Sequence, residues 1–162
     1  MNFEPLDAKR YDRRAFDCGV EALNVYIHRF ANQDVKRGLT RTYVLAEQAR
    51  IVGYYTLSAH SVSHERLPGE LGAGPYQELP FLLLGWLAVD LVHQGHGFGD
   101  VLIVDAFRRT RLVAQQVGIM GMIVDAKDDR AAGFYEKFGF RRLSGTTGRL
   151  ALPLNAMDSL ID

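Results

Sequence analysis

The sequence predicts a mixed α/β fold of the α+β kind. We expect a central, mostly antiparallel sheet of about six to seven strands, flanked by helices, with one parallel strand–helix–strand crossover. Phe81–Val89 is a nearly unbroken apolar run, which is typical of a strand covered on both faces. Residues 103–117 then place apolar side chains at helical spacing on one face. At 162 residues, the chain is expected to form a single domain, residues 1–162.

The N-terminal half predicts one helix and one hairpin. Residues 1–20 are polar and carry clustered arginines, and no regular element is predicted for them. Apolar residues from Leu23 to Ala31 recur at helical spacing, and Gly38 is a stop signal. Arg41–Glu47 and Ile51–Ser58 are rich in β-branched and aromatic residues, so they predict antiparallel strands joined by a short connection.

The rest of the chain predicts a long loop and a second set of elements around the crossover. Residues 63–80 hold several prolines and glycines and are interpreted as a functional loop. Met122–Val124 predicts a short strand, and Asp128 or Asp129 is expected to cap the helix that follows. The last predicted elements are the two strands of a hairpin, Phe140–Leu143 and Arg149–Leu152, and nothing is predicted beyond Pro153.

The turn between the apolar run and the long helix predicts an anion site. Gly95, Gly97 and Gly99 occupy alternating positions in this turn. Glycine lets a backbone approach a ligand closely, and the first turn of a helix has N–H groups without intrahelical partners. Together with the positive end of the helix dipole, these groups can hold a pyrophosphate without a lysine.

Three phosphate-binding patterns compete for this turn, beside the alternative of a plain strand–helix turn. The P-loop requires GK[ST] at its end, where this chain has Gly99-Asp100. The dinucleotide pattern GxGxxG, started from Gly95, would require glycine at position 100. The pattern Q/R-x-x-G-x-G/A is met completely by residues 94–99.

Composition excludes several classes of protein. The chain is 48% hydrophobic and 23% charged with zero net charge, so it is not coated with base as many nucleic-acid-binding proteins are. The single Cys18 excludes an internal disulfide and a cysteine zinc cluster, and a buried role is expected for it. His60 and His64 lack a further ligand pattern, so no metal is predicted. No membrane-spanning apolar run or signal peptide is evident, which makes the cytoplasm the expected location.

Two segments resemble the GNAT family of N-acetyltransferases. Gln94–Gly99 is similar to the turn with which these enzymes bind the pyrophosphate of coenzyme A, and Phe134–Phe140 is similar to their FYxxxGF segment. The resemblance implies the GNAT fold and acetyl-CoA as cosubstrate. A narrower resemblance, to the acetyltransferase toxins of bacterial type II toxin–antitoxin systems, rests on five segments: Phe16–Gly19, Arg41–Val44, Gly53–Ser58, Leu87–Asp90 and Val124–Lys127.

The toxin resemblance implies a substrate and partners. Those toxins acetylate the α-amine of aminoacyl-tRNA, block translation and are neutralised by a ribbon-helix-helix antitoxin. It also implies a homodimer, on resemblance alone. Phosphate contacts with the tRNA are expected from Arg37, Arg41 and Arg142. Further candidates for this basic surface are Arg13, Arg14, Arg141 and Arg149.

The family also implies roles at the acetyl-transfer site. Tyr135 is expected to be the general acid, and the N–H of Val89 is expected to bind the thioester carbonyl oxygen. The residues expected to bind the cosubstrate are Leu87, Ala88, Val89, Gln94, Gly95, His96, Gly97, Phe98, Gly99, Asp100 and Phe134. The sequence does not identify the general base, and the candidates are Asp90, His93, His96, Glu65 and His64. Water can also accept the proton, because the pKa of an esterified α-amine is lowered.

Two other functions stay open at the level of the sequence. One is an acetyltransferase for a small amine or a protein N-terminus, which would present an acidic or apolar acceptor pocket. The other is a binding module whose acetyl-CoA pocket has lost activity. The hydroxyl of Tyr135 and the complete glycine pattern argue against this last function.

Overall fold

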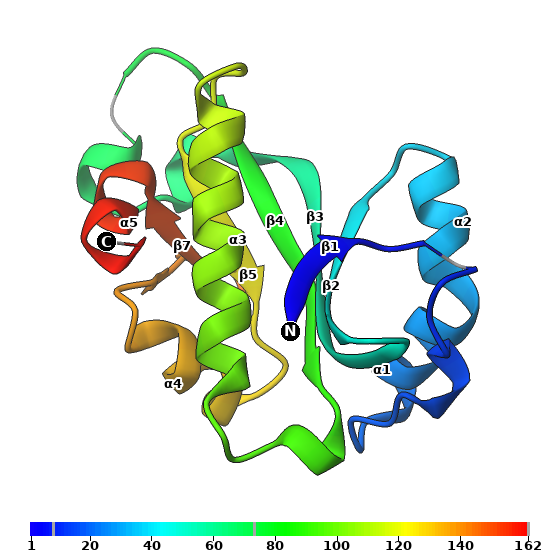
Figure 1. Cartoon of the computed structure of the whole chain (residues 1–162). Helices are drawn as coiled ribbons and strands as arrows, with labels where there is room; N and C mark the ends of the chain where they lie inside the picture. Colours follow the sequence, from blue (N-terminus) through cyan, green and yellow to red (C-terminus); the bar gives the residue numbers. More distant parts are fainter. Residues whose placement is uncertain (8, 73, 162) are drawn as a thin grey trace. The chain divides into compact units, whose positions relative to one another are not determined.

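A computed structural model describes residues 1–7, 9–72 and 74–161. Its contacts divide the chain into two compact units, each of which is described by itself. Unit 1 comprises Met1–Ser58 and Gly85–Ala106, and unit 2 comprises Ala59–Leu84 and Phe107–Asp162. Two long strands and the longest helix each contribute residues to both units. Figure 1 shows the course of the strands and helices along the chain.

The strands are β1 (Asn2–Pro5), β2 (Arg41–Glu47), β3 (Arg50–Ser63), β4 (Glu78–Val89), β5 (Gly121–Asp125), β6 (Arg141–Arg142) and β7 (Arg149–Pro153). The helices are α1 (Glu21–Val25), the π-helical turn η2 (Tyr26–Phe30), α2 (Ala31–Lys36), α3 (Phe98–Ala114), α4 (Asp129–Glu136) and α5 (Leu154–Ile161). Four short 3-10 turns complete the described elements: η1 (Arg13–Ala15), η3 (His64–Arg66), η4 (Gly69–Gly72) and η5 (Leu91–His93).

The strands form a seven-stranded sheet in the order β1-β2-β3-β4-β5-β7-β6. β4 and β5 pair in parallel, from Leu82 opposite Met122 to Leu84 opposite Val124. The pairings of β1 with β2, β2 with β3, β5 with β7 and β6 with β7 are antiparallel. Because α3 connects the parallel strands, the predicted mixed sheet with one strand–helix–strand crossover is confirmed.

In unit 1, the helical segment from α1 to α2 packs on one face of the first strands. Its buried residues Tyr26, Ile27 and Ala31 share a core with Tyr54 of β3. The Tyr54 hydroxyl donates to the carbonyl oxygen of Leu23 at 2.7 Å, so a phenol inside this core keeps a hydrogen-bond partner. Burial raises the pKa of Tyr54, which therefore stays neutral.

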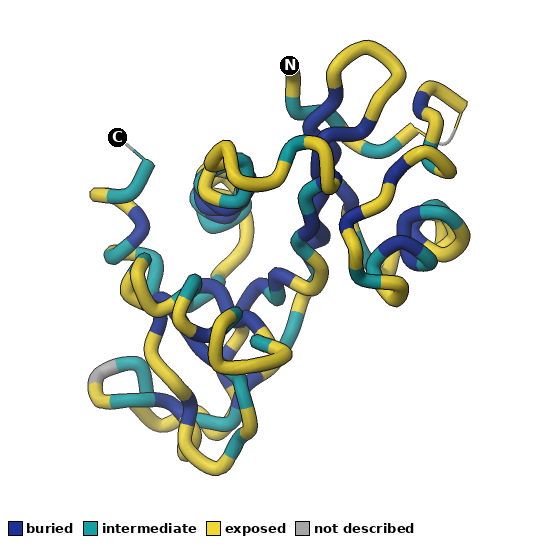
Figure 2. Tube along the Cα trace, turned by 90° about the horizontal axis from the view of Figure 1, so that it is seen from below, coloured by how far each residue is buried: buried dark blue, intermediate teal, exposed yellow. Residues whose placement is uncertain are grey.

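In unit 2, β5 and β7 form the centre of the core. Ile123 and Ala151 face each other in the antiparallel ladder and are fully buried together with Phe81. The Met120 N–H donates to the Pro80 carbonyl at 2.8 Å, which ties the segment before β5 to β4. In Figure 2, buried residues follow the strands, while the helices carry both buried and exposed residues, as amphipathic helices do.

Several predicted elements have different bounds in the structure. β3 continues to Ser63 and β4 begins at Glu78, so the predicted loop of residues 63–80 is shorter and contains η3 and η4. The His64 N–H donates to the Gln77 carbonyl at 2.8 Å, which closes the base of this loop. α3 ends at Ala114, before Val117, which is 60% exposed.

Two elements were not predicted. β1 is short, polar and ends in proline, and it forms a strand by pairing with β2. α5 follows Pro153 directly, and the spacing of Leu154, Met157, Leu160 and Ile161 is the helical signal that could have identified it.

Candidate functional site

The turn between β4 and α3 has the geometry of an anion site. Gly95 and Gly97 adopt φ angles of 80° and 82°, which L side chains rarely adopt. The Val101 N–H donates to the Gly97 carbonyl at 3.2 Å, at the start of a helix of 17 residues. A Cβ added to either glycine would meet no atom within 4 Å, so the space beside the turn is open. An exposed main chain that enters a helix N-terminus suits a pyrophosphate.

A buried carboxylate holds the base of this turn. Asp90 directly follows β4, and its side chain is 3% exposed. It accepts hydrogen bonds from the guanidinium of Arg50 at 2.9 Å and from the N–H of Asp17 at 3.1 Å. The ring Nδ1 of His93 lies 3.3 Å from the same carboxylate. A buried charge with this many partners is stable, and it fixes the direction in which the chain leaves β4.

The side chain of Gln94 connects the same turn to two other segments. Its amide Nε2 donates to the carbonyl oxygens of Cys18 and Val89, both at 2.9 Å. Gln94 was predicted to bind the cosubstrate, and its two amide hydrogens are already engaged within the protein. If Gln94 contacts a pyrophosphate, the contact is therefore made by its main chain and not by its side-chain amide. This bracing role was not predicted, because Gln94 and Cys18 are 76 positions apart in the chain.

The Cys18 turn is itself fixed by local hydrogen bonds. The carboxylate of Asp17 accepts from the N–H of Gly19 and from the amide of Asn24, each at 2.9 Å. These bonds, led by that of Gly19, hold the pKa of Asp17 below its usual value. Cys18 is buried, as predicted.

The second half of β4 has a different hydrogen-bond environment from the first half. The described ladder with β5 ends at Leu84, and Leu87, Ala88 and Val89 follow beyond it. The N–H of Trp86 donates to the hydroxyl of Thr56 at 3.0 Å, where a regular ladder would use a backbone carbonyl. This segment lies in unit 1 with the glycine turn, so the structure keeps the two parts of the predicted thioester site in one unit.

Tyr135 lies on α4 in unit 2, half-buried among aromatic rings. Its ring meets those of Phe134 and Phe140 edge-on, at centroid separations of 5.2 and 5.6 Å. Burial raises the pKa of Tyr135 to about 12. The phenol is therefore protonated at neutral pH, as a general acid must be.

The aromatic segment around Tyr135 has defined ends. Asp128 caps α4, because its carboxylate accepts from the Ala131 N–H at 2.8 Å; of the two caps predicted, Asp128 is the one used. Gly139, at a φ of 101°, lets the chain leave the helix. The ring of Phe134 contacts those of Tyr135 and Phe138. The Nζ of Lys137 lies over the Phe134 ring, 4.9 Å from the ring centroid.

The predicted tRNA-binding arginines differ in how far their charge is offset. Arg37 and Arg41 are exposed in unit 1. Arg142, in unit 2, pairs with Glu136 at 3.2 Å and lies 3.8 Å from Asp129, so part of its charge is already offset. The guanidinium of Arg149 forms a fork on Asp125, with bonds of 2.7 and 2.9 Å, which leaves it poorly suited to a phosphate.

The five residues considered as general base are separated by unit. Asp90 and His93 are paired with each other, and His96 lies 3.3 Å from the His93 carbonyl, all in unit 1. His64 and Glu65 form η3 in unit 2. None of these contacts singles out a base. Among the described residues, no group of three or more histidines, cysteines or carboxylates is placed to hold a metal ion.

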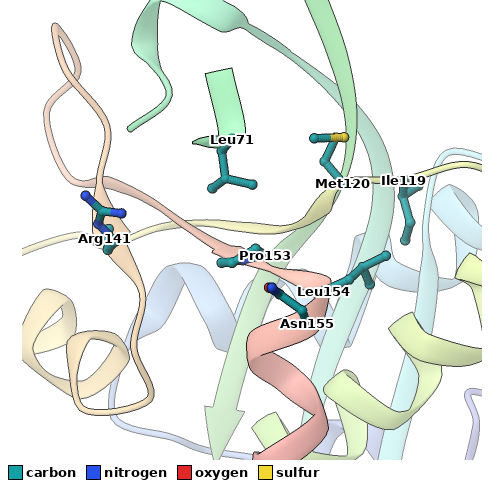
Figure 3. A pocket seen from close by; sticks show the side chains of 7 residues that line it. All are labelled: Leu71, Ile119, Met120, Arg141, Pro153, Leu154 and Asn155. Carbon is teal, nitrogen blue, oxygen red and sulfur yellow. The ribbon is translucent and has the colours of Figure 1, made fainter. Parts of the chain in front are cut away.

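Unit 2 also contains a cavity of about 420 Å³, shown in Figure 3. Its wall is mostly apolar, with Leu71, Met120 and Leu154 around it, and Arg141 at one side supplies a cation. Of the predicted site residues, only Arg141 lines it. No described helix is both long and apolar enough to cross a membrane.

Comparisons with known proteins agree with this geometry. The family model described as "Acetyltransferase (GNAT) domain" matches residues 38–142, which include the glycine turn and Tyr135. A tRNA-acetylating toxin of Mycobacterium tuberculosis is 34% identical over 129 residues, covering 80% of this chain and 78% of the relative.

Solved structures extend the likeness to the whole chain. AtaT complexed with acetyl-methionyl-tRNAfMet is similar with a TM-score of 0.91 and 30% identity, over 99% of each chain. A tyrosine-to-phenylalanine mutant of AtaT, bound to the C-terminus of the antitoxin AtaR and acetyl-CoA, is similar with a TM-score of 0.83 and 29% identity, over 98% of this chain and 96% of that one. The protein therefore belongs to the GNAT family of acetyltransferases, as the glycine turn and the FYxxxGF segment indicated.

Proposed function

We propose that the protein is a toxin that transfers the acetyl group of acetyl-CoA to the α-amine of aminoacyl-tRNA and so blocks translation. The observation that carries this proposal is the full-length likeness to AtaT in its complex with acetyl-methionyl-tRNAfMet. The open glycine turn supports acetyl-CoA as the donor. The whole chain acts as one catalytic domain in the cytoplasm, where charged tRNA is found.

The proposed chemistry is a direct attack. The neutral amine forms a C–N bond to the thioester carbonyl carbon, and the C–S bond to coenzyme A breaks. Tyr135 donates its phenolic proton to the leaving thiolate, and the proton of the amine passes to water. The N–H of Val89 stabilises the carbonyl oxygen of the thioester, which becomes negative after the C–N bond forms and before the C–S bond breaks. The protonated state of the Tyr135 phenol at neutral pH supports this role, because the phenol has a proton to give when the thiolate forms.

Binding of the cosubstrate uses the main chain. The pyrophosphate lies on the N–H groups of residues 95–100, and the pantetheine arm runs along Leu87–Val89 as an added strand. Phe134 packs against that arm. Arg37, Arg41 and Arg142 contact tRNA phosphates, and the exposure of the first two supports this assignment.

A ribbon-helix-helix antitoxin is proposed as the neutralising partner, together with assembly into a homodimer. The AtaT structure with the C-terminus of its antitoxin supports the first of these. Expression of this protein alone should arrest growth, and co-expression of the gene product encoded beside it should restore growth.

The decisive test of function is an acceptor panel. The purified protein is incubated with radiolabelled acetyl-CoA and, in parallel, with bulk aminoacyl-tRNA, uncharged tRNA, free amino acids and polyamines. We expect label only on aminoacyl-tRNA, with transfer that falls steeply as salt is raised. Label on polyamines or free amino acids, with none on tRNA, would contradict the proposed function.

A further inference from the structure

Unit 1 also contains a cavity that the residues of the proposed catalytic site do not line. It has a volume of about 480 Å³ and lies beside β4, and we name it the Asp34 pocket. The residues that line it are Ala22, Val25, Tyr26, Phe30, Asp34 and Trp86. Five of the six come from the continuous helical segment of α1, η2 and α2, and Trp86 comes from β4.

The local sequence explains why these side chains share one face. Residues 22, 26, 30 and 34 recur every fourth position, which forms a single stripe on a helix. The π-helical turn η2 lies in the middle of this stripe, and such turns occur frequently at functional sites. Phe30, at its end, is 50% exposed, although large aromatic side chains usually lie inside.

The pocket combines aromatic rings with one carboxylate. Tyr26 stacks on Trp86 with a centroid separation of 5.0 Å, and Trp86 remains 36% exposed. The Tyr26 hydroxyl donates to the Asp34 carboxylate at 2.9 Å, which fixes that carboxylate beside the rings. Burial raises the pKa of Tyr26, so its hydroxyl remains a donor. Among the described residues that line the pocket, none is a lysine, arginine or histidine. Aromatic faces beside a fixed carboxylate are the chemistry that binds an organic cation.

The pocket also lies within reach of the predicted thioester site along the same strand. Trp86 is three residues before Val89, a separation of roughly 10 Å along a strand. An extended lysine or arginine side chain spans roughly 6 to 8 Å from its Cα at ordinary bond lengths. A contact distance of about 3 to 4 Å between the cation and the pocket closes the remaining gap. An acceptor whose α-amine stands at the thioester could therefore place the cationic end of its side chain against the pocket.

We infer that the Asp34 pocket holds the cationic side chain of the acceptor's amino acid, which makes lysyl-tRNA and arginyl-tRNA the preferred substrates. This inference rests on the proposed function. It also accounts for which nitrogen reacts. A lysine ε-ammonium, with a pKa of about 10.4, stays charged and cannot attack a thioester, whereas an esterified α-amine has a much lower pKa and supplies a far larger neutral fraction. The C–N bond forms at the α-nitrogen, and the C–S bond of the thioester breaks.

The test compares tRNAs charged with lysine, arginine, methionine, leucine or glycine, under one set of conditions. We expect kcat/KM at least about tenfold higher for lysyl- and arginyl-tRNA, the size of a cation–aromatic and carboxylate contact. Alkaline release and mass spectrometry should find Nα-acetyl-lysine. Equal rates on all five tRNAs, or Nε-acetyl-lysine as product, would overturn the inference and leave the proposed function standing.

Variants of the pocket separate this role from a general effect on folding. Asp34→Asn keeps the size of the side chain and should lower kcat/KM for lysyl-tRNA about tenfold, with a smaller change for leucyl-tRNA. Asp34→Glu should restore part of the preference. Glu21→Gln makes the same chemical change at an exposed site of α1 outside the pocket, and it should leave the ratio of the two substrates unchanged. The same ratio in Asp34→Asn as in the unmodified protein would overturn the inference.

A failure of the function itself gives a different result. If no charged tRNA is acetylated but polyamines are, the proposed function and this inference both fall. Calorimetry of acetyl-CoA binding to Asp34→Asn provides the folding control, since the glycine turn lies outside the pocket.

Discussion

In the glycine turn of unit 1 the chemistry resides in main-chain N–H groups, whereas on α4 of unit 2 it resides in one phenolic hydroxyl. Gly95 and Gly97 contribute no side chain; they contribute φ angles of 80° and 82° and open space. Tyr135 contributes a phenol that is protonated at neutral pH, and burial raises its pKa to about 12. The glycine turn therefore depends on backbone conformation and open space, whereas Tyr135 depends on the burial of its side chain.

This difference determines how visible each region is in a sequence. A turn that requires positive φ almost requires glycine, so its spacing can be detected directly. A tyrosine on the apolar side of an amphipathic helix looks the same whether it catalyses or only packs. Only its register with the FYxxxGF segment distinguished Tyr135. The difference also determines how each region can be tested, because a main-chain donor cannot be deleted by substitution and a hydroxyl can.

The largest effect is expected at the hydroxyl. Tyr135→Phe should lower the rate of acetyl transfer roughly 100-fold or more, because the thiolate then leaves without its proton donor. The affinity for acetyl-CoA, measured by calorimetry, should not change. Tyr76→Phe, at a 70% exposed site, is the matched control and should retain full activity. A rate near that of the unmodified protein for Tyr135→Phe would remove Tyr135 from the mechanism.

The next largest effect is expected at the glycine turn. There a substitution should weaken the binding of acetyl-CoA, which Tyr135→Phe leaves unchanged. Gly97→Ala should weaken acetyl-CoA binding at least about tenfold, or about 1.4 kcal/mol, because the methyl group enters the space left for the pyrophosphate. Gly38→Ala is the control, since Gly38 also has positive φ, 74°, and open space around it. Both variants should lose about 1 kcal/mol of unfolding free energy from backbone strain, and only Gly97→Ala should lose affinity. Equal affinities in the two variants would contradict an anion site at the turn.

A smaller effect is expected where a side chain supports the main-chain site. Gln94→Ala removes two hydrogen bonds, to Cys18 and Val89, each with a net contribution of about 1 kcal/mol or less at this exposed position. We expect a few-fold rise in the KM for acetyl-CoA with little change in kcat. Gln94→Glu should be worse than alanine, because a carboxylate would then face two carbonyl oxygens. A pure loss of kcat in either variant would indicate a direct part in the chemistry instead.

The smallest effect concerns an ion pair that neither region uses. The hydrogen bonds from Arg149 lower the pKa of Asp125 below its ordinary value of 3.8. The pair therefore stabilises the fold above that value, and its contribution is lost as the pH falls through the lowered pKa. Because Asp125 is half exposed, the contribution should not exceed about 1 kcal/mol. Urea unfolding of the protein and of Asp125→Asn should differ at pH 6, and the difference should shrink as the pH falls below the ordinary value through the lowered pKa. A constant difference across this range would contradict the assignment.

The predicted fold agrees with the structure where the local pattern was strong, and it differs where pairing decided the outcome. The apolar run of β4, the inner face of α3 and the crossover could all be predicted, because Ile103, Ala106 and Phe107 are fully buried as their spacing required. The four residues of β1 could not be predicted, since a short polar segment becomes a strand only by pairing with β2. The extension of β4 through Pro80 could not be predicted either, because proline argues against a strand until its place is known.

The candidate site divides in the same way. The glycine turn, the cap of α4 and the aromatic segment were evident from residue types at fixed spacings. Three features were not evident, because each joins segments that are distant in the chain. They are the hydrogen bonds of the Gln94 amide, the burial of Asp90 beside Arg50, and the Asp34 pocket. Asp90 and Arg50 are forty positions apart, and no period in the sequence relates them.

The sequence by itself determined the order of the elements from α1 to β7, the position of the glycine turn and the family to which the chain belongs. These properties depend on the conformational preferences of single residues and on short-range periodicity, both of which act within a few positions of the chain. The tertiary structure alone decided which side chains are already engaged and which remain available. The free energy of a buried charge, a raised phenol pKa or an aromatic pocket depends on neighbours that folding brings together from distant positions.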